Sequence, residues 1–147
     1  ARDFHDRPGF RARMNRKYLQ KSEILSSFNL TKKDIDQYIG FINDFKPSLI
    51  IGYPTGLSLM AEHILRYKTD IKSPVTLVSA GETLYDFQRD IIGKAFRHDV
   101  FNRYGCREVI QIASECKAHQ GLHISADHLI VEVINEKGLP GLPGETG

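Results

Sequence analysis

Three short apolar runs, separated by two amphipathic stretches, constrain the fold of this 147-residue chain more than any other feature. The runs are SLIIGY, VTLVSAGE and DVFNRYG, and each is typical of a buried strand. Each connection has room for one helix, and strands joined by such crossovers run parallel. Their near-continuous apolar character agrees, because helices cover both faces of a parallel sheet. The sequence therefore predicts an α/β fold, with a mostly parallel sheet and crossover helices.

Capping residues and helical periodicity predict where the helices begin. In NLTKKDIDQYIGFINDF, Thr31 is a good N-cap and Asp34 follows at capping-box spacing. Pro54 opens the second helix. Thr83 and Asp86 repeat the capping-box spacing before LYDFQRDIIGKAF, so we expect Thr83 to cap the third helix.

The two ends of the chain differ in character from its middle. Residues 1–30 form a basic connecting arm, residues 31–134 the α/β subdomain, and residues 135–147 a Gly/Pro-rich turn segment. After the third run, GLHIS and HLIVEVINEKGLPG are close in sequence and predict a C-terminal antiparallel β-hairpin or an extension of the sheet. Both ends look cut, so we expect the chain to be a piece of a longer protein.

Composition and charge narrow the class of protein. The net charge is only +2, although six basic residues fall in the first seventeen positions, so we expect no nucleic-acid partner. No apolar run approaches the ~20 residues needed to cross a bilayer. Two cysteines suggest a reducing compartment and not a disulfide framework, and the cytoplasm is the expected location.

Ligands of open parallel sheets bind beyond the carboxyl ends of the strands. Those ends are GYPT, SAGET and NRYGCRE, and each carries a glycine that lets the backbone approach a ligand. The last segment has two interpretations: a strand that turns into a short amphipathic helix, or a ligand-binding elbow. In the elbow, Tyr104 offers a flat face, Gly105 allows close approach and Glu108 offers a carboxylate. The three coinciding strand ends favour the elbow.

Each segment also has a structural alternative. The backbone around Gly81 and Glu82 could bind a purine ring, or could be a strand exit followed by a helix cap. The Asn102 amide could pair with a purine edge and Tyr104 could stack on it. They could equally be a turn asparagine and a core tyrosine, and no segment is specific alone.

In their order, the motifs resemble the adenylate-forming ligase superfamily, most closely its phenylacetate–CoA ligase branch and the members linked to capsular polysaccharide synthesis. That branch has approximately GAEP, D-x-Y-G-x-(S/T)-E, GLHI, and VEV followed by G-E-x-G. This chain has AGET, NRYGCRE, GLHI and VEVINEKGLPGLPGETG. The resemblance implies a reaction in which a carboxylic acid and ATP form an acyl-adenylate, and a thiol such as CoA takes the acyl group.

The resemblance also implies roles for individual residues. Glu108 would be catalytic and coordinate the Mg²⁺ that bridges the ATP phosphates, and Mg²⁺ usually takes only one or two protein carboxylates. Tyr104 would stack on adenine and Asn102 would meet its amino edge. The remaining nucleotide-binding residues would be Gly81, Glu82, Thr83, Arg103, Gly105 and Arg107. GYPTGLSLMAEHI resembles the helix that borders the acyl pocket.

The chain departs from the branch in ways that bear on activity. Arg107 stands where the branch has Ser or Thr. It could give a bidentate bond to the adenylate phosphate, or could pair with Glu108 and close the metal site. Asn102 for Asp and Thr83 for Pro are milder changes. The phosphate loop and the catalytic lysine would lie outside these residues, so the fragment alone should be inactive. The alternative is a non-catalytic nucleotide- or zinc-binding module of the same fold.

A second constellation, CKAHQGLH, predicts a zinc site. Cys116, His119 and His123 are spaced C-x2-H-x3-H, and Cys106 could complete a tetrahedral set of thiolate and imidazole ligands. The alternative is a free core cysteine with two histidines on a loop and a strand. The other histidines, among them His63, are expected on the surface or on helix faces.

Overall fold

The computed structural model describes residues 22–27, 30–72, 76–142 and 144. Most of the predicted basic arm and of the terminal GETG therefore lies outside the described residues. The elements of the described part are α2 (Lys32–Phe45), β1 (Leu49–Gly52), α3 (Pro54–Tyr67), β2 (Thr76–Ala80), α4 (Asp86–Phe96), β3 (Val100–Tyr104), β4 (Ala113–Ser114) and β5 (His123–Ile124). None of these helices has the length and apolar character needed to span a membrane.

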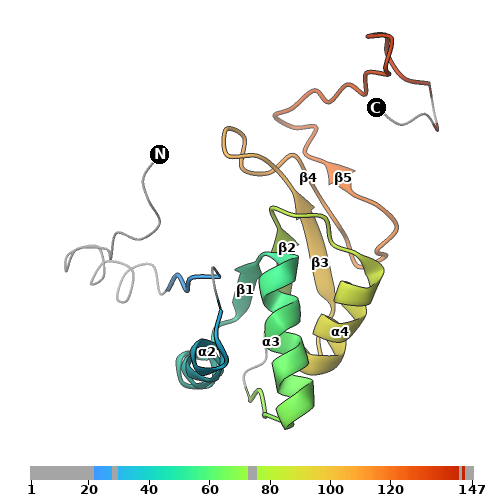
Figure 1. The fold of residues 1–147 in the computed structure, drawn as a ribbon. Coiled ribbons are helices and arrows are strands. Elements are labelled where there is room, and N and C mark those ends of the chain that lie inside the picture. Colours follow the sequence, from blue (N-terminus) through green and yellow to red (C-terminus); the bar gives the residue numbers. More distant parts are fainter. Residues whose placement is uncertain (1–21, 28–29, 73–75, 143, 145–147) are drawn as a thin grey trace.

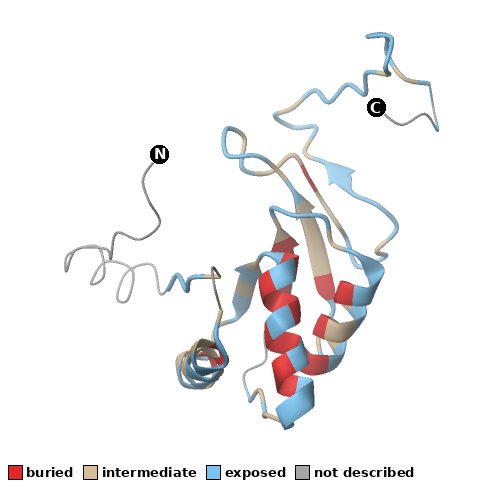
Figure 2. Cartoon of the chain, in the orientation of Figure 1, coloured by how far each residue is buried: buried red, intermediate tan, exposed pale blue. Residues whose placement is uncertain are grey.

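The first three strands form the parallel part of the sheet, as predicted. The sheet order is β1-β2-β3-β4-β5, and β1 pairs with β2, and β2 with β3, in parallel. Helices α3 and α4 are the crossovers, and they lie side by side on one face of the sheet (Figure 1). This layer holds most of the core, and buried residues recur along both helices (Figure 2). Its most deeply buried members include Ala61, Leu77, Ile92, Phe96 and Val100.

The opposite face of the sheet is less covered within the described residues. Ile51, Val78 and Phe101 are in register across β1, β2 and β3. Because side chains alternate along a strand, these three lie on the face away from the buried Leu77 and Val100. Ile51 is 49% exposed. The apolar runs predicted helices on both faces of the sheet. In the structure, α3 and α4 both pack against the same face (Figure 1).

The C-terminal strands pair differently from the prediction. GLHIS supplies β5, but β5 pairs antiparallel with β4, and β4 pairs antiparallel with β3. The predicted second strand of the hairpin, HLIVEV, forms no strand in the described residues beyond a single bridge between Ile134 and Pro140. The chain reverses directly after β3 and forms β4, and β4 takes the place beside β5. Ile130 of this segment is 94% exposed, so it packs on no sheet face among the described residues.

Helix α2 begins as predicted, whereas α4 does not. The Thr31 Oγ1 accepts a hydrogen bond from the Asp34 N–H at 3.3 Å, and the Thr31 N–H donates to the Asp34 carboxylate at 2.9 Å. The expectation that Thr83 caps α4 is wrong, because Tyr85 is the N-cap. The Tyr85 N–H donates to the Gln88 side-chain oxygen at 3.1 Å. Leu84 packs against the core before the helix starts, which moves the start two residues along.

Candidate functional site

The carboxyl ends of β1, β2 and β3 reach the same edge of the sheet because the three strands are parallel. The GYPT segment, the SAGET segment and the loop 105–112 follow these ends, and the loop projects beyond the tips of β2 and β3 (Figure 1). The first turns of α3 and α4 begin at this edge as well. The fold therefore brings together the three segments from which the sequence predicted a ligand site.

Tyr53 and Gly81 are in direct contact at this edge. Gly81 has a φ of +85°, and a Cβ atom placed on it would lie 2.5 Å from the Tyr53 Cε1 atom. Only glycine combines this backbone conformation with this close approach. Tyr53 stays 42% exposed, so part of its ring is open to the edge of the sheet. Nothing in the sequence marked Tyr53 beyond its place directly after a predicted strand.

Glu82 joins the SAGET segment to helix α3. One Glu82 carboxylate oxygen accepts hydrogen bonds from the Thr55 hydroxyl at 2.6 Å and from the Thr55 N–H at 3.2 Å. The Glu82 side chain is thus directed to α3, which leaves the backbone of residues 81–83 as the part of this segment available at the edge. This contact joins residues 27 positions apart, and no local pattern could have predicted it.

The turn after β3 depends on Gly105. A Cβ atom on Gly105 would lie 2.0 Å from the Ile110 carbonyl oxygen, so no other residue fits without moving the backbone. The Ile112 N–H then donates to the Tyr104 carbonyl at 2.9 Å, which closes the reversal into β4. Tyr104 is 58% exposed at the end of β3, and is not the core residue of the structural alternative.

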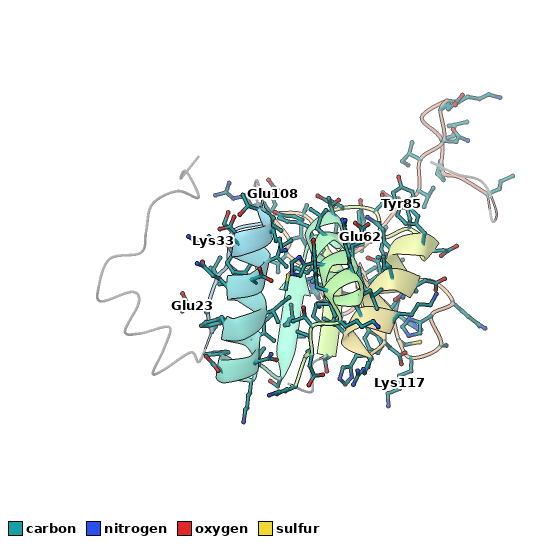
Figure 3. The ribbon with its side chains drawn as sticks, turned by 60° about the horizontal axis from the view of Figure 1, so that its bottom comes forward. Glu23, Lys33, Glu62, Tyr85, Glu108 and Lys117 are labelled. Carbon is teal, nitrogen blue, oxygen red and sulfur yellow. The ribbon has the colours of Figure 1, made fainter. Side chains whose placement is uncertain are left out.

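Residues 106–108 lie in the loop beyond Gly105. Cys106, Arg107 and Glu108 are all exposed. Arg107 and Glu108 form no ion pair in the part of the chain that the structure describes. In Figure 3 the labelled side chains of Glu108 and Tyr85 lie higher in the picture than that of Lys117. The Glu108 carboxylate therefore reaches solvent at the carboxyl edge of the sheet.

A charged cluster lies beneath this edge and supports β3. The Glu115 side chain is only 6% exposed and accepts hydrogen bonds from Arg89, from the Asn102 N–H at 2.8 Å and from His119 Nδ1 at 3.0 Å. Arg89 also donates to the Val100 carbonyl. Burial acts to raise the pKa of Glu115, but the bonds from Arg89, Asn102 and His119 outweigh it and hold the pKa below its ordinary value. Sequence reasoning missed both Arg89 and Glu115.

The four predicted zinc ligands do not come together. Cys106 follows β3 and Cys116 follows β4, and the two strands are antiparallel, so the cysteines lie at opposite ends of the pair. His119 is turned toward Glu115, and the centroid of its ring lies 5.0 Å from that of the Phe101 ring. Among the described residues, no group of three or more His, Cys, Asp or Glu side chains is placed to hold a metal. His123, in β5, is exposed.

His63 lies on a face of helix α3, one of the two places expected for it, and it is buried there. Its Nε2 atom lies 2.7 Å from the Asp36 carboxylate, which joins α3 to α2. The Tyr67 ring packs beside it at 4.6 Å. This contact belongs to the packing of the helices and lies away from the carboxyl edge.

No protein-family model matches the sequence. Protein CapK of Staphylococcus aureus is 30% identical over 95 residues, which are 64% of this chain and 21% of CapK. A 2-hydroxyisobutyryl-CoA ligase structure matches with a TM-score of 0.63 and 16% identity over 74% of this chain and 25% of its own. An anthranilate CoA ligase, AuaEII, solved with anthranoyl-AMP, matches with a TM-score of 0.63 and 20% identity over 80% of this chain and 24% of its own. A benzoate CoA ligase from Burkholderia xenovorans LB400 matches with a TM-score of 0.58 and 17% identity over 76% and 24%.

These comparisons confirm the resemblance that the motifs indicated. The described residues share the fold of a part of these three CoA ligases, which is the fold that the resemblance implied. The chain spans about one fifth of CapK and about a quarter of each of the three ligases.

Proposed function

We propose that this chain is the nucleotide-binding part of an ATP-dependent acid-activating ligase. In the full-length protein, a carboxylic acid and ATP would form an acyl-adenylate, and a thiol such as CoA would then take the acyl group. The observation that carries the proposal is the meeting of the GYPT, SAGET and NRYGCRE segments at one edge of a sheet whose fold is shared with acid–CoA ligases. The chain alone would be inactive, because it supplies only part of such a site.

The nucleotide would bind across the ends of β2 and β3. The Tyr104 ring is exposed and could stack on adenine, and Asn102 lies two residues earlier on the same strand. The backbone of residues 81–83 would line the other side of the ring. Arg103 and Gly105 complete the strand end, and Gly105 keeps it close to the loop.

The loop after Gly105 would face the phosphates. Arg107 is exposed, and its guanidinium could give a charge-assisted, bidentate bond to a phosphate. Glu108 makes no ion pair within the described residues, so its carboxylate is available to a cation. A lone carboxylate fits Mg²⁺, which usually takes one or two protein carboxylates together with water and substrate phosphates. When bound, Mg²⁺ would offset the charge of the phosphates, and Glu108 would hold it at this loop.

The acid would bind on the side of β1 and α3. The motif GYPTGLSLMAEHI resembles the helix that borders the acyl pocket. Helix α3 begins inside this motif, at Pro54. Tyr53 would present its exposed ring edge to this side. Use of ATP and CoA is compatible with the cytoplasmic location that we propose.

The test is ATP–pyrophosphate exchange by the full-length protein with a panel of aromatic, aliphatic and sugar-linked carboxylic acids. The proposal expects exchange that depends on both Mg²⁺ and one class of acid. A folded full-length protein that binds ATP but shows no exchange with any acid of the panel would contradict it.

A further inference from the structure

The amino end of α3 lacks a cap of its own. Tyr53 is the N-cap residue, and its side chain makes no capping hydrogen bond. Pro54, at the first position, has no N–H, so the Thr55 N–H is the first that needs an acceptor. The Thr55 N–H must therefore find its acceptor in solvent or elsewhere in the fold.

Glu82 supplies that acceptor from the segment after β2. Its carboxylate binds both the Thr55 N–H and the Thr55 hydroxyl, and a negative charge at the amino end of a helix interacts favourably with the helix dipole. The hydroxyl bond is short, at 2.6 Å, as expected for a bond to a charged acceptor. One side chain thus fixes the first turn of α3 to the SAGET segment.

The contact between Tyr53 and Gly81 lies directly beside this bond. Tyr53 and Thr55 flank Pro54, and Gly81 precedes Glu82. The start of α3 and the SAGET segment are therefore joined at two places, by the contact of Tyr53 with Gly81 and by the bond of Thr55 to Glu82. The glycine lets the ring approach, and the carboxylate keeps the helix end from moving away. The two segments therefore behave as one unit at the edge of the sheet.

We propose that Glu82 is a positioning residue, which sets the acid-binding side of the site against its adenine-binding side. This inference rests on the proposed function, in which the backbone of residues 81–83 lines the adenine and the start of α3 borders the acid. In-line attack on ATP needs the acid carboxylate to be held within a fraction of an ångström, so a shift of α3 relative to the SAGET segment weakens productive acid binding. Adenine binding, which uses the SAGET backbone, the Asn102 amide and the Tyr104 ring, is unaffected.

The experiment uses the full-length protein and compares Glu82→Ala and Thr55→Val with the conservative variants Glu82→Gln and Thr55→Ser. ATP–pyrophosphate exchange gives kcat and the KM values for acid and for ATP separately. We expect Glu82→Ala and Thr55→Val each to raise the KM for the acid about tenfold, the scale of one lost charge-assisted hydrogen bond. The KM for ATP should stay within about twofold, and both conservative variants should recover most of the loss.

A double variant and a control separate the inference from a general loss of stability. Glu82→Ala combined with Thr55→Val should be no worse than Glu82→Ala alone, because Glu82→Ala already removes both bonds to Thr55. Glu136→Ala, which removes an exposed carboxylate that the proposed site does not use, should match the wild type.

Each remaining outcome has one meaning. If both KM values rise together, or only the amount of active protein falls, Glu82 is merely structural and the inference is wrong while the proposed function stands. A wild-type protein without exchange activity would overturn the proposed function, and this inference with it.

Discussion

Arg89 and Glu115 form a two-pronged ion pair across the described fold, with 2.6 Å between Nη2 and Oε1 and 3.0 Å between Nη1 and Oε2. Arg89 belongs to α4, and Glu115 follows β4. Through Glu115 the pair also holds the middle of β3, at the Asn102 N–H. The strand that carries Asn102 and Tyr104 to the candidate site is therefore bonded by both members of the pair, by Glu115 at the Asn102 N–H and by Arg89 at the Val100 carbonyl.

Replacing Glu115 with alanine should destabilise the protein by about 3 kcal/mol. This is the low end for breaking a buried ion pair, because Arg89 is about a quarter exposed and can regain some water. The free energy of unfolding from denaturant titration measures the loss. Glu136→Ala removes an exposed carboxylate and should change it by less than about 0.5 kcal/mol. Equal effects of the two changes would contradict the role given to Glu115.

The stability that Glu115 contributes should depend on pH in a defined direction. Its pKa in the folded protein lies below the ordinary value of 4.5, so as pH falls the unfolded chain takes up the proton first. The contribution is complete above the ordinary pKa and is lost as pH falls through the folded pKa.

The measurement is the free energy of unfolding of the wild type and of Glu115→Gln, from neutral pH down to about pH 3. The gap between the two proteins should be constant near neutrality and should narrow below the ordinary carboxyl pKa. Asp34, whose pKa is lowered by its bonds to Thr31, titrates in both proteins and cancels from the difference. A difference in the free energy of unfolding that widens as pH falls would contradict a lowered pKa of Glu115.

Thr31 and Thr83 form a matched pair for helix capping. Thr31→Ala should cost about 1 kcal/mol, because it removes the side-chain half of the capping box of α2. Thr83→Ala should cost close to nothing, because α4 is capped at Tyr85 instead. Thermal or chemical unfolding of both variants checks this, and a larger loss at Thr83 would contradict the placement of the start of α4.

Two glycines should respond oppositely to alanine. Gly105→Ala should destabilise the protein by about 2–3 kcal/mol, because the new Cβ would meet the Ile110 carbonyl at 2.0 Å and force the backbone apart. Gly40→Ala should stabilise it by up to about 1 kcal/mol, because Gly40 lies inside α2 with nothing within 4 Å of the new atom. Unfolding midpoints of the two variants on the same side of the wild type would refute this account of the turn.

The sequence predicted best where the deciding interactions are local. Periodicity and capping placed α2, α3 and the three parallel strands, and Thr31 and Asp34 form the capping box that their spacing indicated. The spacing alone could not separate Thr83 from Tyr85 as the cap of α4, because packing of Leu84 decides between them.

The sequence did not predict which strands pair after β3. Which strand lies beside β5 depends on where the chain reverses after Gly105, and the apolar alternation of HLIVEV misled the prediction. The same holds within the candidate site. The three strand ends were predicted to meet, but the bond from Glu82 to Thr55 joins residues 27 positions apart, and neither residue carries a signal for the other. Cysteine and histidine spacing suggested zinc, whereas the antiparallel turn separates the donors.

The most direct test of the proposed chemistry is ATP–pyrophosphate exchange by Glu108→Gln in the full-length protein, once an activated acid is known. The change preserves size and hydrogen bonding and removes the charge that would hold Mg²⁺. Folding should change little, because Glu108 is exposed in its loop. We predict that exchange falls about 10²-fold or more, the scale of losing one preorganised electrostatic group. Exchange at the wild-type rate, from a folded variant, would contradict the assignment of Glu108 and of this loop to the phosphates.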